Sequence, residues 1–168
     1  MNRGKAHRLD PFDHVNTDYI ISGRYKFRIS NMKELARYVF EDIDPDFSKK
    51  VQKGDYVVAG ENFGCGSSRE QAPWAIKEAG IAAVLAKSFA RIFYRNAFNI
   101  GLCLVECDTS LIDNGDIIEL DLDKELVIDH TKNRLIKTMP IPSLMRRFLE
   151  DGGVVTHFKK YGGFKLSK

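Results

Sequence analysis

The sequence is short of cysteine and of long apolar runs, and these two shortages exclude several classes of protein. Only three cysteines occur among 168 residues, none in a C-x-x-C pair, so we expect no disulfide framework and a reducing compartment. No apolar run approaches the ~20 residues of a membrane span. The first residues, Met1 to Lys5, also lack the apolar core of a signal peptide. We therefore expect a cytoplasmic protein without a membrane partner.

The sequence also lacks a strong charge of either sign. Its formal net charge is +3 at pH 7, with 43% hydrophobic and 29% charged residues. This balance gives no reason to expect a nucleic-acid partner and is ordinary for a globular chain. Four lysines near the end are expected to form a solvated tail: Lys159, Lys160, Lys165 and Lys168. Because no linker is evident, we expect one domain over residues 1–168.

The middle of the chain predicts an α/β fold. Apolar strands at 56–59, 81–86 and 102–105 alternate with helices at 72–79 and 89–98, and this order is typical of parallel βαβ units. Additional C-terminal strands are predicted at 116–122, 125–129 and 133–139. A closing helix begins near Pro142 and ends at Gly152–Gly153. Nearer the N-terminus we expect a strand at 5–9 and a helix from Ser30 or Asn31 to Phe40.

The stretch from Gly64 to Gln71 is the strongest candidate for a functional site. It lies where a strand, a tight turn and a helix start are predicted, and its glycines allow positive φ. Ser68 and Gln71 have the spacing of a capping box. Backbone N–H groups, hydroxyls and Arg69 can converge on one anion, and the guanidinium fork suits a carboxylate. Pro73 predicts either an irregular first turn or a later helix start.

The turn and the cysteines also have alternative interpretations, which the sequence supports to different degrees. The turn can also be a capped helix start whose serines only satisfy backbone groups, and this alternative stays open. A serine hydrolase is disfavoured because the G-x-S-x-G spacing is absent and the histidines are scattered. The spacing of Cys65, Cys103 and Cys107 does not favour an iron–sulfur cluster. We expect buried cysteines and no metal site on this chain.

Residues Gly60 to Ala75, which read GENFGCGSSREQAPWA, resemble the signature of the small subunits of 3-isopropylmalate dehydratase and homoaconitase. These subunits are free-standing relatives of the mobile last domain of aconitase. The resemblance extends in order over nearly the whole chain. The other matching segments are Asn16–Ile21, Ser22–Tyr25, Lys87–Phe93, Asn96–Gly101 and Gly115–Asp116.

The resemblance implies a fold, a reaction and a partner. The fold is the swivelling β/β/α domain of the aconitase family. The reaction is the dehydration and rehydration of a hydroxy di- or tricarboxylic acid by a hydro-lyase. A large subunit is expected to carry a [4Fe–4S] cluster, in a heterodimer or heterotetramer, so this chain holds no cofactor and is inactive alone.

The resemblance also implies roles for individual residues. Ser67 matches the serine that removes a proton from carbon as an alkoxide, and Ser68 and Arg69 match neighbours that hold a substrate carboxylate. The remaining substrate-binding residues expected from the matching segments are Thr17, Asp18, Tyr25, Lys26, Phe27 and Arg28.

The substrate depends on the loop from Tyr25 to Arg28. The family commonly has leucine where this chain has Lys26, and the apolar Phe27 suits an alkyl tail. Lys26 or Arg28 can instead pair with a carboxylate, or face solvent or the large subunit. 3-Isopropylmalate, an intermediate of leucine biosynthesis, is the leading substrate, with homoaconitate and 2,3-dimethylmalate as alternatives. A stand-alone carboxylate-binding module and an inactive regulatory partner are the competing hypotheses.

Overall fold

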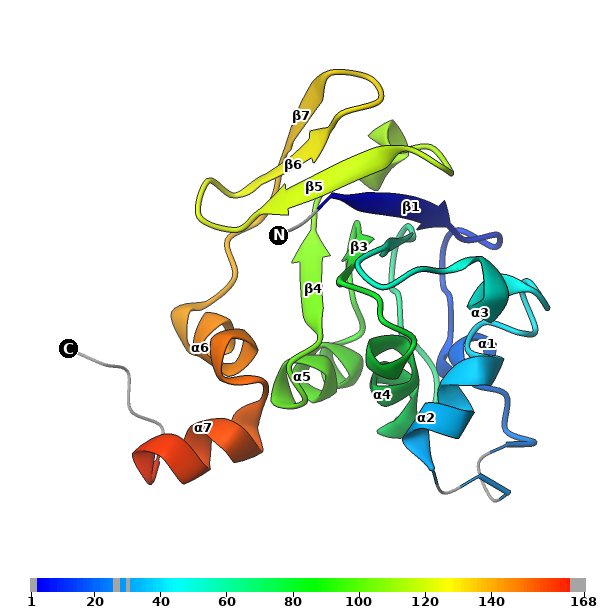
Figure 1. Ribbon diagram of the computed structural model, residues 1–168, viewed down its shortest axis with the longest axis vertical. Helices are drawn as coiled ribbons and strands as arrows, with labels where there is room; N and C mark the ends of the chain where they lie inside the picture. Colours follow the sequence, from blue (N-terminus) through cyan, green and yellow to red (C-terminus); the bar gives the residue numbers. More distant parts are fainter. Residues whose placement is uncertain (1–2, 26–27, 30, 164–168) are drawn as a thin grey trace.

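The structure, a computed structural model, describes residues 3–25, 28–29 and 31–163, which are organised around one seven-stranded sheet (Figure 1). The strands are β1 (Gly4–Arg8), β2 (Tyr56–Val58), β3 (Ala83–Ala86), β4 (Cys103–Glu106), β5 (Ile117–Asp121), β6 (Leu126–Asp129) and β7 (Arg134–Lys137). The helices are α1 (Thr17–Ile20), α2 (Met32–Leu35), α3 (Phe47–Lys50), α4 (Gln71–Glu78), α5 (Arg91–Asn99), α6 (Ser143–Asp151) and α7 (Val154–Tyr161), with 3-10 turns η1 (Ala36–Tyr38) and η2 (Thr109–Leu111). None of these described helices is long and apolar enough to cross a bilayer.

The sheet has a parallel half and an antiparallel half. Its strand order is β4-β3-β2-β1-β5-β6-β7. The pairs β1–β2, β2–β3 and β3–β4 are parallel, whereas β1–β5, β5–β6 and β6–β7 are antiparallel. Helices α4 and α5 provide the crossovers between the parallel strands. The predicted parallel βαβ core with additional C-terminal strands is therefore confirmed.

Each central parallel strand contributes to two cores, because successive side chains point to opposite faces. Val57 and Val84 pack in the core that also contains the buried faces of α4 and α5. Tyr56 and Leu85 pack in a second core with Ile118 of β5. In Figure 1, β5–β7 lie at one end of the molecule and α1, α2, α4 and α5 lie at the other. Burial on both faces explains why these strands read as continuous apolar runs.

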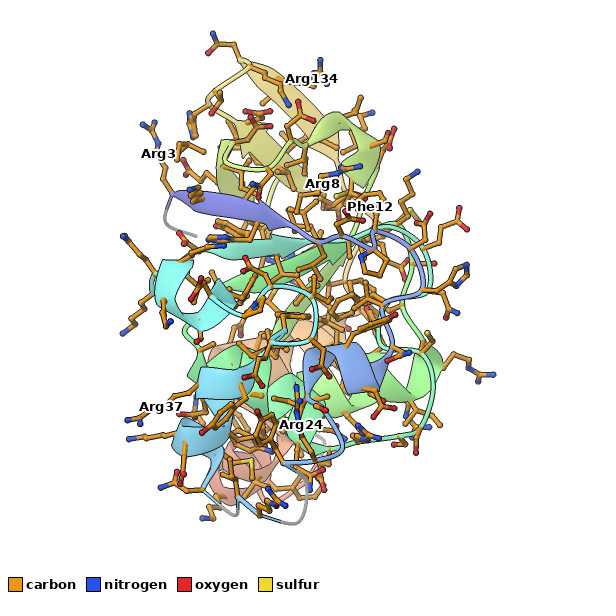
Figure 2. The ribbon with its side chains drawn as sticks, turned by 90° about the vertical axis from the view of Figure 1, so that its right-hand side faces the viewer. Arg3, Arg8, Phe12, Arg24, Arg37 and Arg134 are labelled. Atoms are coloured by element: carbon orange, nitrogen blue, oxygen red, sulfur yellow. The ribbon has the colours of Figure 1, made fainter. Side chains whose placement is uncertain are left out.

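Arg8, at the end of β1, fixes the segment that leads into the candidate site. Its Nη1 donates to the carbonyl oxygens of Thr109 at 3.0 Å and Ile112 at 2.9 Å. Its guanidinium also lies 3.6 Å from the centre of the Phe12 ring, a cation–π contact visible in Figure 2. The chain after β1 is thereby held against η2 before it reaches α1.

The helix predicted up to Phe40 is shorter than expected. Asn31 caps α2 by accepting from the Lys33 N–H at 2.9 Å, and η1 follows directly. Val39 is extended and Phe40 has a φ of +56°. The Phe40 N–H donates to the Ile20 carbonyl at 2.9 Å, and both side chains enter the first core. Tertiary packing overrides the helical pattern here.

Lys159 and Lys160 are exposed, as predicted for solvated lysines, but they lie on helix α7 rather than in a tail. The His157 ring of this helix is fully buried, with Nδ1 2.8 Å from Asp151 Oδ2. Lys160 Nζ donates to the other oxygen of Asp151 at 2.8 Å. These interactions with the end of α6 hold α7 in place. Lys165 and Lys168 lie outside the described residues.

Candidate active site

The glycine-rich turn lies between the segment before α1 and the start of α5. Isolated parallel β-bridges join Cys65 to Asn16, before α1, and Phe63 to Phe89, before α5. The Gly64 N–H donates to the Val15 carbonyl at 2.8 Å. Gly64 has a φ of +78°, and a Cβ at this position would lie 2.2 Å from Phe93 Cγ. Glycine is therefore required here both for backbone conformation and for space.

Thr17, at the start of α1, holds the turn from the other side. Its N–H donates to the Cys65 carbonyl at 2.9 Å, and its Oγ1 donates to the Ser67 carbonyl at 2.7 Å. Its side chain is buried. The structure thus places Thr17 as a support that fixes the backbone before and at Ser67.

The predicted capping box between Ser68 and Gln71 is wrong. Helix α4 begins at Gln71, its N-cap residue is Glu70, and that cap has no side-chain hydrogen bond. Pro73 consequently falls in the first turn, where its missing N–H costs no intrahelical hydrogen bond. The later helix start leaves Ser68 in the turn rather than in a cap.

Arg69 is held in one position by two groups of the α1 region. Its Nη1 donates to the Ile21 carbonyl at 2.9 Å and lies 2.5 Å from Asp18 Oδ1. The Arg69 side chain is 13% exposed, whereas that of Asp18 is 56% exposed. Among the described residues, Arg69 Nε has no hydrogen-bond partner although it is buried. The described residues therefore leave one N–H donor of the guanidinium unused.

A cavity of about 480 Å³ lies beside this turn. Its lining consists of Thr17, Asn62, Gly64, Gly66, Ser68, Arg69, Ala90, Arg91, Ile92, Phe93, Arg95 and Asn96. Three arginines and no acidic residue are present in this described lining, so the cavity favours an anionic ligand. Ser67 is exposed and stands between two lining residues, Gly66 and Ser68. The structure thus brings Thr17, Ser68 and Arg69 together at one cavity, with Ser67 and Asp18 adjacent.

Sequence reasoning missed the contribution of α5. Arg91 and Arg95 line the cavity, with Asn96 beside them and Asn62 on the turn side. The apolar pattern of residues 89–98 predicts only a crossover helix. The sequence does contain a signal for this contribution. Arg91 and Arg95 are four residues apart, and such residues share one face of a helix.

Of the loop from Tyr25 to Arg28, the structure describes Tyr25 and Arg28, and neither lines the cavity. The Tyr25 hydroxyl donates to Glu41 Oε2 at 2.5 Å, and its ring stacks on Tyr38 with centroids 4.1 Å apart. The hydrogen bond to the Glu41 carboxylate raises the pKa of Tyr25. Arg28 is exposed. Lys26 and Phe27 lie outside the described residues.

Gly23 is the part of this loop that approaches the arginine. A Cβ at Gly23 would lie 3.7 Å from Arg69 Nη2 and 3.6 Å from Asp18 Oδ1. The described start of the loop therefore borders the ion pair of Arg69, although Tyr25 and Arg28 do not line the cavity.

The cysteines have different environments. Cys103 and Cys107 are buried in the second core, and burial raises the pKa of each thiol to about 12. Without a metal both are therefore protonated near neutral pH, and they pack as small apolar side chains of this core. Cys65 is half-buried, and its thiol donates to the His14 carbonyl at 3.4 Å. Among residues that the structure describes, no group of three or more His, Cys, Asp or Glu is placed to hold a metal ion.

Comparison with known proteins gives consistent matches over nearly the whole chain. Residues 19–110 match the aconitase C-terminal domain family. The chain is 55% identical to 3-isopropylmalate dehydratase small subunit 2 of Archaeoglobus fulgidus, over 92% of this chain and 93% of that protein. It is 52% identical to the methanogen homoaconitase small subunit of Methanocaldococcus jannaschii, over 94% and 91%. A crystal structure described as 3-isopropylmalate dehydratase from the same organism superposes with a TM-score of 0.91 at 52% identity, covering 95% of this chain and 94% of that chain.

Proposed function

Because this chain belongs to the aconitase C-terminal domain family, among the small subunits of 3-isopropylmalate dehydratase and its close relatives, we propose that it supplies half of a divided active site. It is a hydro-lyase small subunit, and the names of its relatives imply a larger partner. One observation carries the proposal. Arg69 is held by Asp18 and the Ile21 carbonyl beside a cavity rich in arginine, next to Ser67.

The proposed substrate is 3-isopropylmalate, which places the reaction in leucine biosynthesis. Relatives that cover more than nine-tenths of this chain at 50–55% identity are named for 3-isopropylmalate dehydratase. Homoaconitate is the second candidate because the Methanocaldococcus jannaschii relative at 52% identity is named a homoaconitase small subunit. Dimethylmalate is retained as the third substrate to be assayed.

The residues of this chain suit the proton-transfer half of the reaction. Dehydration breaks one C–H bond and one C–O bond, and the two electrons of the C–H bond form the new double bond. Ser67 Oγ, as an alkoxide, takes the proton, while the hydroxide leaves toward the partner's half of the site. Positive charge from Arg69, two residues further along the turn, favours an oxyanion at Ser67. Arg69 and Ser68 hold a substrate carboxylate through paired N–H donors and a hydroxyl.

The cluster that the family implies does not fit the described residues of this chain. Cys103 and Cys107 are buried in the second core, Cys65 lies on the turn, and the described residues contain no group of three His, Cys, Asp or Glu placed to hold a metal ion. We therefore assign the [4Fe–4S] cluster to the large subunit. On the present chain we assign only proton transfer and carboxylate binding.

Reconstitution with a large subunit tests the proposal. The two chains are co-expressed, purified without oxygen and assayed on isopropylmalate, homoaconitate and dimethylmalate. We expect activity only from the complex, and most with isopropylmalate. Ser67→Ala is expected to assemble normally and to lose about 100-fold or more of kcat, since it removes the proton acceptor. Ser143→Ala, at the exposed start of α6, serves as the matched control.

Three outcomes would contradict the proposal in different ways. No activity from any pairing on the three substrates would refute the hydro-lyase assignment. Full activity of Ser67→Ala would remove this serine from the mechanism. Tight binding of a hydroxy diacid by the small subunit alone would instead favour a stand-alone carboxylate-binding module.

A further inference from the structure

A second hollow lies next to the cavity of the candidate active site. It has a volume of about 390 Å³ and is lined by Phe89, Arg91, Tyr94, Arg95, Glu106, Met139, Pro140 and Pro142. Arg91 and Arg95 line both spaces. The two arginines therefore form the border between the substrate cavity and an adjoining surface that the proposed reaction does not use.

Apolar side chains at this border are unusually exposed. Ile92 is 59% exposed and Met139 is 62% exposed. The segment that carries Met139 is fixed rather than loose, because the Met139 N–H donates to the Glu106 carbonyl at 2.8 Å. Exposed apolar residues are ordinary when scattered, but a group beside a functional cavity marks an interaction surface. We call Arg91, Ile92, Arg95 and Met139 the α5 rim.

The charges of the α5 rim are unpaired within the described part of the chain. Arg69 pairs with Asp18, and Arg24 pairs with Asp42. By contrast, no described carboxylate forms an ion pair with Arg91 or Arg95, although Glu106 lines the same hollow. Both arginines are exposed and lie on one face of α5 at i and i+4. The hollow beside the rim combines arginine, methionine and aromatic residues, which are types enriched at protein interfaces.

We propose that the α5 rim is the surface on which the large subunit docks, with a carboxylate of that subunit paired to Arg91 or Arg95 and apolar side chains packed on the exposed Ile92 and Met139. The inference rests on the proposed function, which requires a partner to cover the cavity. Arg91, Ile92 and Arg95 line that cavity, and Met139 lines the adjoining hollow that shares the two arginines, so a chain that closes over the substrate and extends into the hollow meets all four residues. Charge complementarity then selects an acidic partner segment over a basic one.

Binding measurements with the intact large subunit test this inference without relying on turnover. Wild type, Arg95→Glu, Ile92→Asp and Met139→Asp are compared by isothermal titration calorimetry. All three positions are exposed, so the variants are expected to fold, and circular dichroism checks this. The matched controls are Arg134→Glu and Leu135→Asp on β7. Leu135 is 64% exposed, and Figure 2 shows Arg134 at the end of the molecule opposite Arg24 and Arg37.

The result expected is a roughly tenfold or greater rise in Kd for each rim variant, with the β7 controls close to wild type. Unchanged Kd values for the rim variants, with normal binding by wild type, would overturn the rim assignment and leave the proposed function standing. A raised KM for Arg95→Glu with unchanged Kd would also overturn it, because the arginine would then hold substrate. No binding by the wild-type chain would overturn the proposed function and this inference together.

Discussion

Asp55 shows at the scale of a single residue how a buried charge is stabilised. Its carboxylate accepts from the N–H groups of Lys5 and Gln52, each at 2.9 Å, and lies 2.8 Å from His7 Nε2. Burial by itself would raise the pKa of Asp55. The hydrogen bonds from His7 and from the two backbone N–H groups outweigh burial and hold the pKa below its ordinary value. The carboxylate therefore joins β1 to the start of β2.

Asp55→Asn is expected to destabilise the subunit in a pH-dependent way. Because the folded pKa of Asp55 is lowered, its contribution is fully present above the unfolded value of about 3.8 and is lost as the pH falls through the folded value. At pH 7 we expect a loss of about 2 kcal/mol in the free energy of unfolding. The difference from wild type should shrink below pH 4. Urea unfolding between pH 2.5 and pH 7 measures both effects.

The control for this prediction is Asp46→Asn, which removes an exposed i,i+3 pair with Lys49. Such a pair is solvated, so no measurable change in the free energy of unfolding is expected. A constant offset between Asp55→Asn and wild type over the whole pH range would contradict the assigned cause.

At the scale of elements, the site depends on how closely the turn approaches α5. Gly64 lies against the buried ring of Phe93, and that ring packs edge-on against Phe63 with centroids 5.3 Å apart. The turn and the helix are therefore packed directly against each other through this ring. The same contact brings the cavity-lining arginines of α5 next to Ser68 and Arg69.

Gly64→Ala is expected to lower the stability of the subunit strongly. The new Cβ meets Phe93 at 2.2 Å, and alanine is disfavoured at a φ of +78°. Left-handed backbone costs about 1–2 kcal/mol for alanine, and overpacking adds about 1–3 kcal/mol. Thermal unfolding measures the loss.

Gly162→Ala separates the cost of the left-handed backbone from the cost of overpacking. Gly162 has a φ of +67°, but a Cβ added there would meet no atom within 4 Å, so only the backbone cost applies. Equal losses for the two variants would show that the contact with Phe93 is unimportant.

At the scale of the whole molecule, the proposed reaction is divided between two chains. The small subunit presents an arginine-lined cavity and a serine, and Tyr25, at the start of the loop that we propose selects the substrate, contacts Glu41 and Tyr38. This arrangement separates substrate selection from the chemistry assigned to the partner. Substrate preference should then follow the small subunit when large subunits are exchanged.

Exchanging Lys26, Phe27 and Arg28 together for the residues of a homoaconitase small subunit is expected to alter substrate preference more than stability. The ratio of kcat/KM for isopropylmalate and homoaconitate should change by roughly tenfold or more, as expected for pocket contacts with an alkyl or carboxylate group. Steady-state assays of the complex measure this ratio. Lys49→Ala with Lys50→Ala on α3 is the control for removal of surface charge. An unchanged ratio would mean that this loop does not select the substrate.

Much of the fold follows from patterns that act within a few residues. Apolar runs predict β2, β3 and β4, and the 3.6-residue periodicity predicts α4 and α5. Gly152 ends α6 in the left-handed conformation, as the Gly152–Gly153 pair predicts. The glycine-rich turn with Arg69 is also evident locally, because its glycines and its arginine are close together in the chain.

The remaining features depend on residues far apart in the sequence. The hydrogen bond from Thr17 to Ser67 joins residues that are 50 positions apart in the sequence. This bond holds the turn just before α4, and the helix begins only at Gln71. The first core draws in Phe40, the pairing of α7 with Asp151 orders two predicted tail lysines, and α5 brings Arg91 and Arg95 to the cavity. Local propensities amount to fractions of a kcal/mol per residue, whereas burial of a large side chain is worth about 1.5–3 kcal/mol. Long-range packing therefore determines the structure at those positions where local propensity and burial favour different conformations.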